Sequence, residues 1–225
     1  MIDGEALVLT ARLAFVTCLI LITLSIPLAA WLAYSQRRWT VIVEAVVALP
    51  LVLPPSVLGY YLLVAMGSRS PIGRWWESVT GEPLAFTFTG LVVASVLYSL
   101  PFAVQPLMAA FSGIDRRLLE ASFVLGRGWV STVTRVVLPL SRIGLVTAIV
   151  LTFAHTVGEF GVVLMVGGNI PGETRTASIA VYDAVQSFDD RTAAVMSLIL
   201  LAFSAVVLVA TYALRKAPLS VWPRT

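Results

Sequence analysis

Two side chains able to exchange protons lie within one apolar stretch of the sequence. His155 and Glu159 stand four positions apart in residues 143–172, where Glu159 is the only acidic or strongly basic residue. On a helix this spacing places both side chains on one face, where they can act as acid and base or pair to hold a charge. Neither an HExxH nor a GxSxG motif nor a second carboxylate accompanies them, which argues against an enzyme. The chain has only one histidine, which argues against a metal site.

A second group of positions combines prolines with hydroxyls. Pro50, Pro54 and Pro55 lie in the apolar window 45–68, and each removes a backbone donor, so together they predict a kinked or broken helix. In lipid the freed carbonyl groups must face protein or a water-filled cavity. Two interpretations remain open: a structural kink, or an irregular helix that lines a path through the membrane and hinges there. The hydroxyls able to hydrogen-bond a solute weakly on such a path belong to Ser56, Ser95, Ser99 and Thr156.

The composition indicates what kind of protein must position these residues. Of 225 residues, 59% are hydrophobic and 12% are charged, against roughly 25% charged in soluble domains. The predicted fold class is therefore an all-α membrane protein. Five apolar windows reach the roughly 20 residues that cross a bilayer. They predict five transmembrane helices in a single domain, residues 1–225, at about 8–35, 42–67, 89–112, 141–166 and 192–214.

The distribution of charge predicts the orientation. With the N-terminus outside and the C-terminus in the cytoplasm, ten of the 15 Lys and Arg residues lie on the cytoplasmic side and five outside. Positively charged loops stay in the cytoplasm, so this orientation is the expected one. Residues 113–140 then form a cytoplasmic loop. The net charge of +3 comes without any basic run, so we expect a lipid bilayer and no nucleic acid as the partner of these charges.

The cytoplasmic loop has the pattern of a helical hairpin. Asp115 is a plausible N-cap for about three turns of helix, and Gly126 is expected to end that helix. Gly126 and Gly128 are both free to take a positive φ and reverse the chain, and a second helix follows from about Val130. The hairpin could lie on the membrane surface or dock on a partner. Its apolar side comprises Leu118, Leu119 and Phe123.

The spacing within this loop resembles a known signature. Glu120-Ala121-Ser122, three residues, Gly126, nine residues and then Val136-x-Leu138-Pro139 is similar to the EAA motif of ABC importer permeases. That motif reads Glu-Ala-Ala, x3, Gly, x9, Ile-x-Leu-Pro, and five of its seven defined positions match. In that family the first helix of the loop docks in a groove on the ATPase subunit. The resemblance implies that the residues listed here couple transport to that ATPase: Leu118, Leu119, Glu120, Ala121, Ser122, Phe123, Gly126, Leu138 and Pro139.

Two further segments resemble the molybdate-specific permeases of this class. They are residues 49–60, and residues 158–161 together with 168–176. The resemblance implies a type I importer fold that pairs with a second copy of itself and binds two ATP-binding cassette subunits in a prokaryotic cell (inner) membrane. A soluble oxyanion-binding protein outside would deliver the cargo. Sulfate and tungstate permeases share the architecture, so they remain alternatives. At His155 a basic residue, commonly Arg, is expected in that family.

The same residues bear on mechanism and on competing classes. The chain lacks a GxxxxGK[ST] loop, so ATP and Mg²⁺ are expected on the partner ATPase and no cofactor on this chain. A carboxylate would repel an anionic cargo, so we expect His155 and Glu159 to form a structural or gating pair rather than a binding site. A channel or secondary transporter is the main competitor, and it predicts internal repeats, which the sequence does not show.

Overall fold

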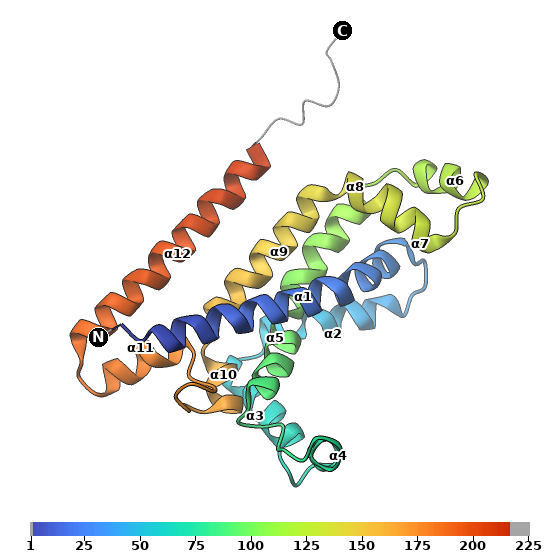
Figure 1. The fold of residues 1–225 in the computed structure, drawn as a ribbon. Helices are drawn as coiled ribbons and strands as arrows, with labels where there is room; N and C mark the ends of the chain where they lie inside the picture. Colours follow the sequence, from blue (N-terminus) through green and yellow to red (C-terminus); the bar gives the residue numbers. More distant parts are fainter. Residues whose placement is uncertain (1, 217–225) are drawn as a thin grey trace.

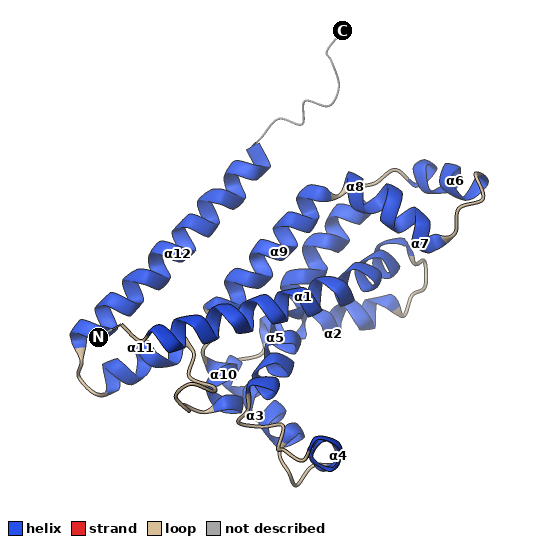
Figure 2. Ribbon diagram, in the orientation of Figure 1, coloured by secondary structure: helices blue, strands red, loops and turns tan. Residues whose placement is uncertain are grey.

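The computed structural model describes residues 2–216, which form helices joined by loops, with no strand in that range (Figures 1 and 2). The order of the elements is α1 (Gly4–Tyr34), α2 (Thr40–Val52), α3 (Pro55–Met66), α4 (Pro71–Thr80), α5 (Phe88–Ser112), α6 (Arg116–Val124), α7 (Trp129–Thr132), a π-helical turn η1 (Val133–Val137), α8 (Leu138–Leu140), α9 (Arg142–Val157), α10 (Gly161–Gly167), α11 (Ala177–Gln186) and α12 (Asp190–Lys216).

Three of these helices, α1, α5 and α12, are individually long and apolar enough to cross a membrane. Two bent pairs bring the total to five if each counts as one span: α2 with α3, bent by 112°, and the segment 129–140 with α9, bent by 83°. The all-helical membrane fold is thus confirmed. The predicted break of the helix within 42–67 is confirmed, whereas the expectation of one continuous helix over 141–166 is wrong, because α9 ends at Val157 and α10 begins at Gly161.

The prolines account for the first interruption, as predicted. Helix α2 ends at Val52, and α3 starts at Pro55 with Pro54 as its N-cap residue. Proline suits the first turn of a helix, where its missing N–H would have no partner, and Pro54 and Pro55 lack the N–H groups that would continue α2. The second interruption separates α9 from α10 at residues 158–160.

The two interruptions lie against each other because α3 and α10 pack closely. A Cβ atom at Gly59 of α3 would lie 2.8 Å from the Cβ of Met165, and a Cβ at Gly161 of α10 would lie 2.8 Å from the Cβ of Pro55. Only glycine fits at such distances without displacing its neighbour. The glycines therefore let the two short helices approach side by side.

The core of the bundle is formed by α1, α5 and α9 (Figure 1). Its largest cluster of buried residues includes Ala29, Leu107, Phe111, Val137 and Ala148. Helix α12 packs on α9 and α11 and leaves most of its apolar surface exposed. The Asp189 carboxylate accepts a hydrogen bond from the N–H of Thr192 at the start of α12. Hydrogen bonds from the hydroxyl and N–H of Thr192 hold the pKa of Asp189 below its usual range.

Candidate functional site

A cavity of about 550 Å³ lies where the two interruptions meet. The start of α3, the middle of α5 and the gap between α9 and α10 contribute its walls, which are lined by Pro55, Ser56, Tyr98, Ala154, His155, Gly158, Glu159, Phe160 and Gly161. Four predicted site residues, Pro55, Ser56, His155 and Glu159, are thus brought to one place. Pro50 lies within α2 and is not among the lining residues.

Hydroxyl groups of α5 hold the two titratable residues. The hydroxyl of Ser95 donates to Oε2 of Glu159 at 2.6 Å, and the Ser99 hydroxyl lies 2.8 Å from Nδ1 of His155. Ser99 also lies 3.1 Å from the hydroxyl of Thr156. Ser95, Ser99 and Thr156 are essentially fully buried. In this conformation they position their neighbours, and their weak binding of a solute stays a prediction.

The hydrogen-bond chain fixes the tautomer of His155. Thr156 donates its single hydroxyl proton to the carbonyl of Thr152 at 3.0 Å. Ser99 must therefore donate to Thr156, and Nδ1 of His155 donates to Ser99. A neutral imidazole then keeps its lone pair on Nε2. The ring is held on its other side by stacking on Phe102, with centroids 3.9 Å apart.

Glu159 is anchored in the gap through its side chain and its backbone. The residue is 3% exposed, and its Oε1 atom has no hydrogen-bond partner among the described residues. Its backbone carbonyl accepts a hydrogen bond from Ser178 of α11. The polar atoms left free are Nε2 of His155 and Oε1 of Glu159, and neither carries a fixed positive charge. They suit a water molecule or a proton rather than a bare anion, which favours a structural or gating role.

The direct pairing of His155 with Glu159 is not what the structure contains. Neither an ion pair nor a hydrogen bond joins the two side chains within residues 2–216, and each bonds to its own serine on α5. The physical reason is the end of the helix: α9 stops at Val157, so Glu159 no longer follows the helical path that would place it one turn beyond His155.

The predicted hairpin is present between α5 and α9. The Asp115 carboxylate accepts from the N–H of Arg117 at 2.9 Å and caps α6. Gly126 takes φ +77°, while the N–H of Gly126 bonds the carbonyl of Phe123 and that of Arg127 bonds Ser122. These two bonds form a Schellman motif with the glycine at C′. Gly128 has φ −75°, so of the two glycines only Gly126 uses the left-handed region.

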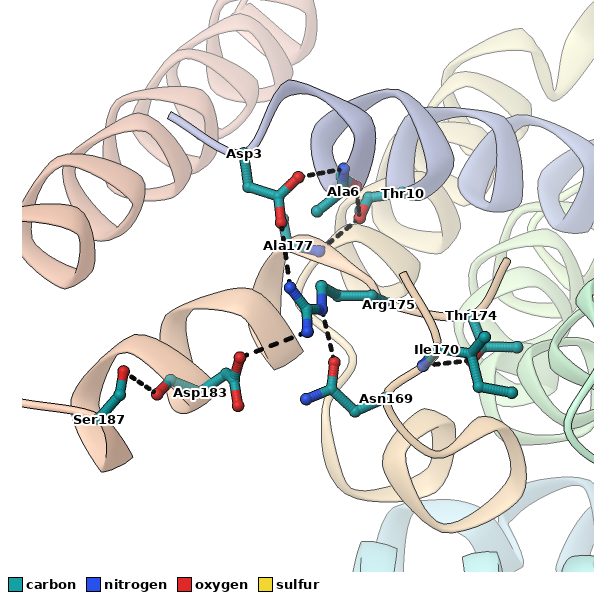
Figure 3. A network of polar contacts seen from close by, with 10 residues as sticks. All are labelled: Asp3, Ala6, Thr10, Asn169, Ile170, Thr174, Arg175, Ala177, Asp183 and Ser187. Carbon is teal, nitrogen blue, oxygen red and sulfur yellow. Dashed lines mark hydrogen bonds and ion pairs between the residues drawn. The ribbon is translucent and has the colours of Figure 1, made fainter. Parts of the chain in front are cut away.

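A network at the opposite end of the bundle ties the loop before α11 to α1 (Figure 3). Nε of Arg175 donates to the side chain of Asn169 at 2.6 Å, and its terminal nitrogens pair with Asp3 at 3.7 Å and Asp183 at 3.4 Å. The Thr10 hydroxyl accepts from the N–H of Ala177 at 2.7 Å. Sequence reasoning singled out residues 168–176 only as a resemblance and missed this role.

Comparisons with known proteins identify the family. The family described as "Binding-protein-dependent transport system inner membrane component" matches residues 25–217. The chain belongs to this family. The chain is 50% identical over 214 residues to the molybdenum transport system permease protein ModB of Azotobacter vinelandii, covering 95% of each chain. It is 38% identical over 167 residues to ModB of Escherichia coli K12, covering 72% of this chain and 73% of that one.

The fold has solved counterparts within ABC transporters. A bacterial ABC transporter involved in the import of the acidic polysaccharide alginate aligns with a TM-score of 0.75 at 17% identity, covering 95% of this chain and 79% of that chain. At this identity the likeness concerns the fold alone. The protein is therefore a multi-pass membrane permease of a binding-protein-dependent ABC importer.

In this permease the hairpin residues that are buried and exposed are not all those that the sequence predicts. Leu119 is 5% exposed and Ser122 is 4% exposed, and the Ser122 hydroxyl lies 2.9 Å from that of Thr132 in α7. Both residues therefore hold the hairpin together and cannot enter a groove on another protein. Leu118 and Phe123 are about half exposed. Glu120, Ala121 and Pro139 are also exposed, whereas Leu138 is partly covered.

The most exposed apolar residues of the hairpin were missed by sequence reasoning. They are Val124, Leu125 and Val130, exposed by 87%, 78% and 74%. All three flank the Gly126 turn. Their position in the sequence could have identified them, because they lie at the tip of the predicted hairpin. Side chains at the tip cannot reach the interior between the two helices and so stay exposed.

Proposed function

We propose that the chain is the membrane-spanning subunit of an ATP-driven importer for molybdate or a similar tetrahedral oxyanion. The observation that carries the proposal is the 50% identity over 95% of each chain with a molybdenum transport permease. The capped hairpin of the EAA type supports the same conclusion. Tungstate and sulfate are the alternative cargoes, since permeases for these anions share the architecture.

The assembly we propose contains two copies of this chain, two ATP-binding cassette subunits and a soluble oxyanion-binding protein outside. ATP and Mg²⁺ bind to the cassette subunits, and this chain binds no cofactor. The exposed apolar tip of the hairpin supports docking on an ATPase, because exposed apolar residues at the centre of a contact supply much of its binding energy. Leu118, Phe123, Val124 and Leu125 are the residues offered for that contact.

The topology we propose has five spans in the inner membrane, with the N-terminus outside and the hairpin in the cytoplasm. A single cysteine replacing Arg127, in a chain whose native Cys18 is changed to Ser, tests it. The introduced thiol should react with an impermeant reagent only from the cytoplasmic side, and a cysteine replacing Asn169 should react only from outside. Labelling at Arg127 from outside would contradict the orientation.

The path we propose passes the cavity at the interrupted helices, with Pro54 and Pro55 as the hinge. His155 and Glu159 then act as gate supports. Selectivity is left to the binding protein, because conduction requires entry without tight retention. No Lys or Arg lies in the walls of this cavity, which fits a conduit better than an anion trap.

The deciding experiment is uptake by the complete complex in proteoliposomes. The purified permease, ATPase and binding protein should drive ATP-dependent uptake of labelled molybdate, with tungstate and sulfate compared at equal concentrations. Vesicles that lack the ATPase serve as the control. Uptake without the ATPase would favour a channel or secondary transporter, and preferential uptake of sulfate would support the alternative cargo.

A further inference from the structure

The short helix α4 presents an apolar stripe that no part of the described chain covers. Ile72, Trp75, Trp76 and Val79 follow the spacing i, i+3, i+4, i+7, which places them on one face. Trp76 packs against a cluster that includes Met66 and Leu84. The other three remain 56%, 63% and 68% exposed, in the order Ile72, Trp75 and Val79.

We propose that α4 is an interfacial helix that lies in the outer headgroup region of the bilayer with this stripe turned into the lipid. The stripe is defined here as Ile72, Trp75 and Val79. The inference rests on the proposed orientation only in assigning α4 to the outer side of the bilayer. It does not depend on the cargo.

The first argument is the opposite face of the helix. Arg74, Glu77 and Ser78 are exposed and lie away from the stripe. A helix with an apolar stripe on one side and charged groups on the other lies along a membrane surface, with its apolar face about 5–10 Å into the boundary of the acyl chains. Neither Arg74 nor the preceding Arg69 has an ion-pair partner in the described part of the chain, so both cations are available to lipid phosphates.

The second argument is that the direction of the stripe is fixed. The Ser70 hydroxyl caps α4 by accepting from the N–H of Gly73 at 2.8 Å. A Cβ at Gly73 would lie 2.1 Å from the carbonyl oxygen of Gly67, so the helix is held tightly against the end of α3. At its other end Gly81 takes φ +79° and reverses the chain. The helix therefore cannot roll to bury the stripe against its own chain.

The third argument is position. Helix α4 follows α3 at the end of the bundle that faces away from α6 and α7 (Figure 1). A helix at the end of membrane spans meets the headgroup layer, where tryptophan is enriched because its ring is apolar and its N–H is polar.

Lipid fits the stripe better than a second protein. A stable protein interface buries roughly 800 Å² on each partner, which three side chains on a ten-residue helix do not supply. A second copy of the chain or the binding protein would also leave Arg69 and Arg74 without acidic partners unless it brought its own. A lipid surface requires no such match.

Spin labels on the full-length chain in liposomes of phosphatidylethanolamine and phosphatidylglycerol test the proposal. In a Cys18→Ser background, single cysteines replace Ile72, Trp75 or Val79 and, as matched controls on the polar face, Arg74 or Ser78. Collisions with oxygen, which concentrates in lipid, and with a water-soluble nickel chelate are measured at each label. The ratio of oxygen to nickel accessibility should be several-fold higher at the three stripe positions than at the two controls.

Two outcomes would overturn the proposal. High nickel accessibility at all five positions would place the stripe in water. Low accessibility to both reagents at the stripe would mean that protein covers it, as a second copy or a soluble partner would do. Because oxygen and nickel report lipid and water on either side of the bilayer, a reversed topology would leave this result unchanged, so failure of the proposed orientation is distinguishable. In the chain labelled at position 79, a second substitution, Trp75→Glu, should lower the oxygen accessibility of the label several-fold. Ser78→Glu in the same chain should leave it unchanged.

Discussion

Replacing Gly126 by Val should weaken the contact of the hairpin with the ATPase while leaving the chain inserted in the membrane. Gly126 holds φ +77° at the C′ position of α6. A side chain in the left-handed region costs roughly 1–2 kcal/mol, and a β-branched residue lies at the upper end. No atom lies within 4 Å of the site of a Cβ there, so no steric clash adds to this cost.

The net magnitude follows from a second effect of opposite sign. Val also restricts the disordered loop, which stabilises the ordered form by about 0.4–1 kcal/mol. The remaining cost is about 1–1.5 kcal/mol, or roughly a tenfold loss of the ordered hairpin relative to the disordered one. Where the ATPase selects the ordered hairpin, its apparent Kd rises in proportion to the loss of the ordered fraction, by about tenfold at most.

Gly128→Val is the matched control for this prediction. Gly128 has φ −75° and ψ 168°, which suit a β-branched residue, and it too has open space around a Cβ. Binding of purified ATPase to the permease in nanodiscs should be weaker, by up to about tenfold, for Gly126→Val and unchanged for Gly128→Val. ATP-driven uptake should fall only for Gly126→Val. Equal binding by wild type and Gly126→Val, or equal loss in both variants, would refute the reasoning.

Four further variants address the cavity and the outer network. Changing Pro54 and Pro55 together to Ala should straighten the junction of α2 and α3 and alter uptake kinetics without loss of insertion; unchanged kinetics would mean that the prolines are only tolerated. Glu159→Gln should lower the yield of assembled complex more than it changes the preference among oxyanions. Ser95→Ala should also lower the yield, because it leaves the buried carboxyl of Glu159 without its hydrogen-bond donor, and an unsatisfied buried polar group costs about 1–3 kcal/mol. A changed preference with normal assembly would make Glu159 a selectivity element. Arg175→Ala should speed hydrogen exchange in α11 several-fold, and exchange as slow as in the wild type would show that the network does not hold that helix.

Predictions from the sequence were correct where a single residue type determines the local backbone conformation. Asp115 as a cap, Gly126 as a left-handed C′ residue and the prolines as a break all follow from the chemistry of single residues, and the structure contains all three. The general fold followed from composition, because only membrane helices accommodate so apolar a chain. Such features need no knowledge of distant contacts.

The wrong predictions concern residues whose burial or conformation is determined by contacts with segments distant in the sequence. Leu119 was expected to face a partner, but α7 folds back across it and Ser122, which periodicity along α6 alone does not reveal. The gap between α9 and α10 contains no proline. It is maintained by Ser95 on α5 and Ser178 on α11, which bond Glu159 from two sides. Sequence spacing along one helix carries no information about either partner.

Helix α9 connects the hairpin to the cavity. This helix starts immediately after the hairpin, at Arg142, and ends at the wall of the cavity. A Cβ at Gly144 would lie 2.3 Å from the Cβ of Ala110 in α5, so the two helices are in close contact at the hairpin end. At the other end the hydroxyls of α5 hold His155 and Glu159. We therefore expect a displacement of the hairpin by a partner to move α5 and α9 together, and the break between α2 and α3, which we propose as the hinge, to absorb the movement. That break adjoins the same cavity, because Pro55 and Ser56 at the start of α3 line its wall.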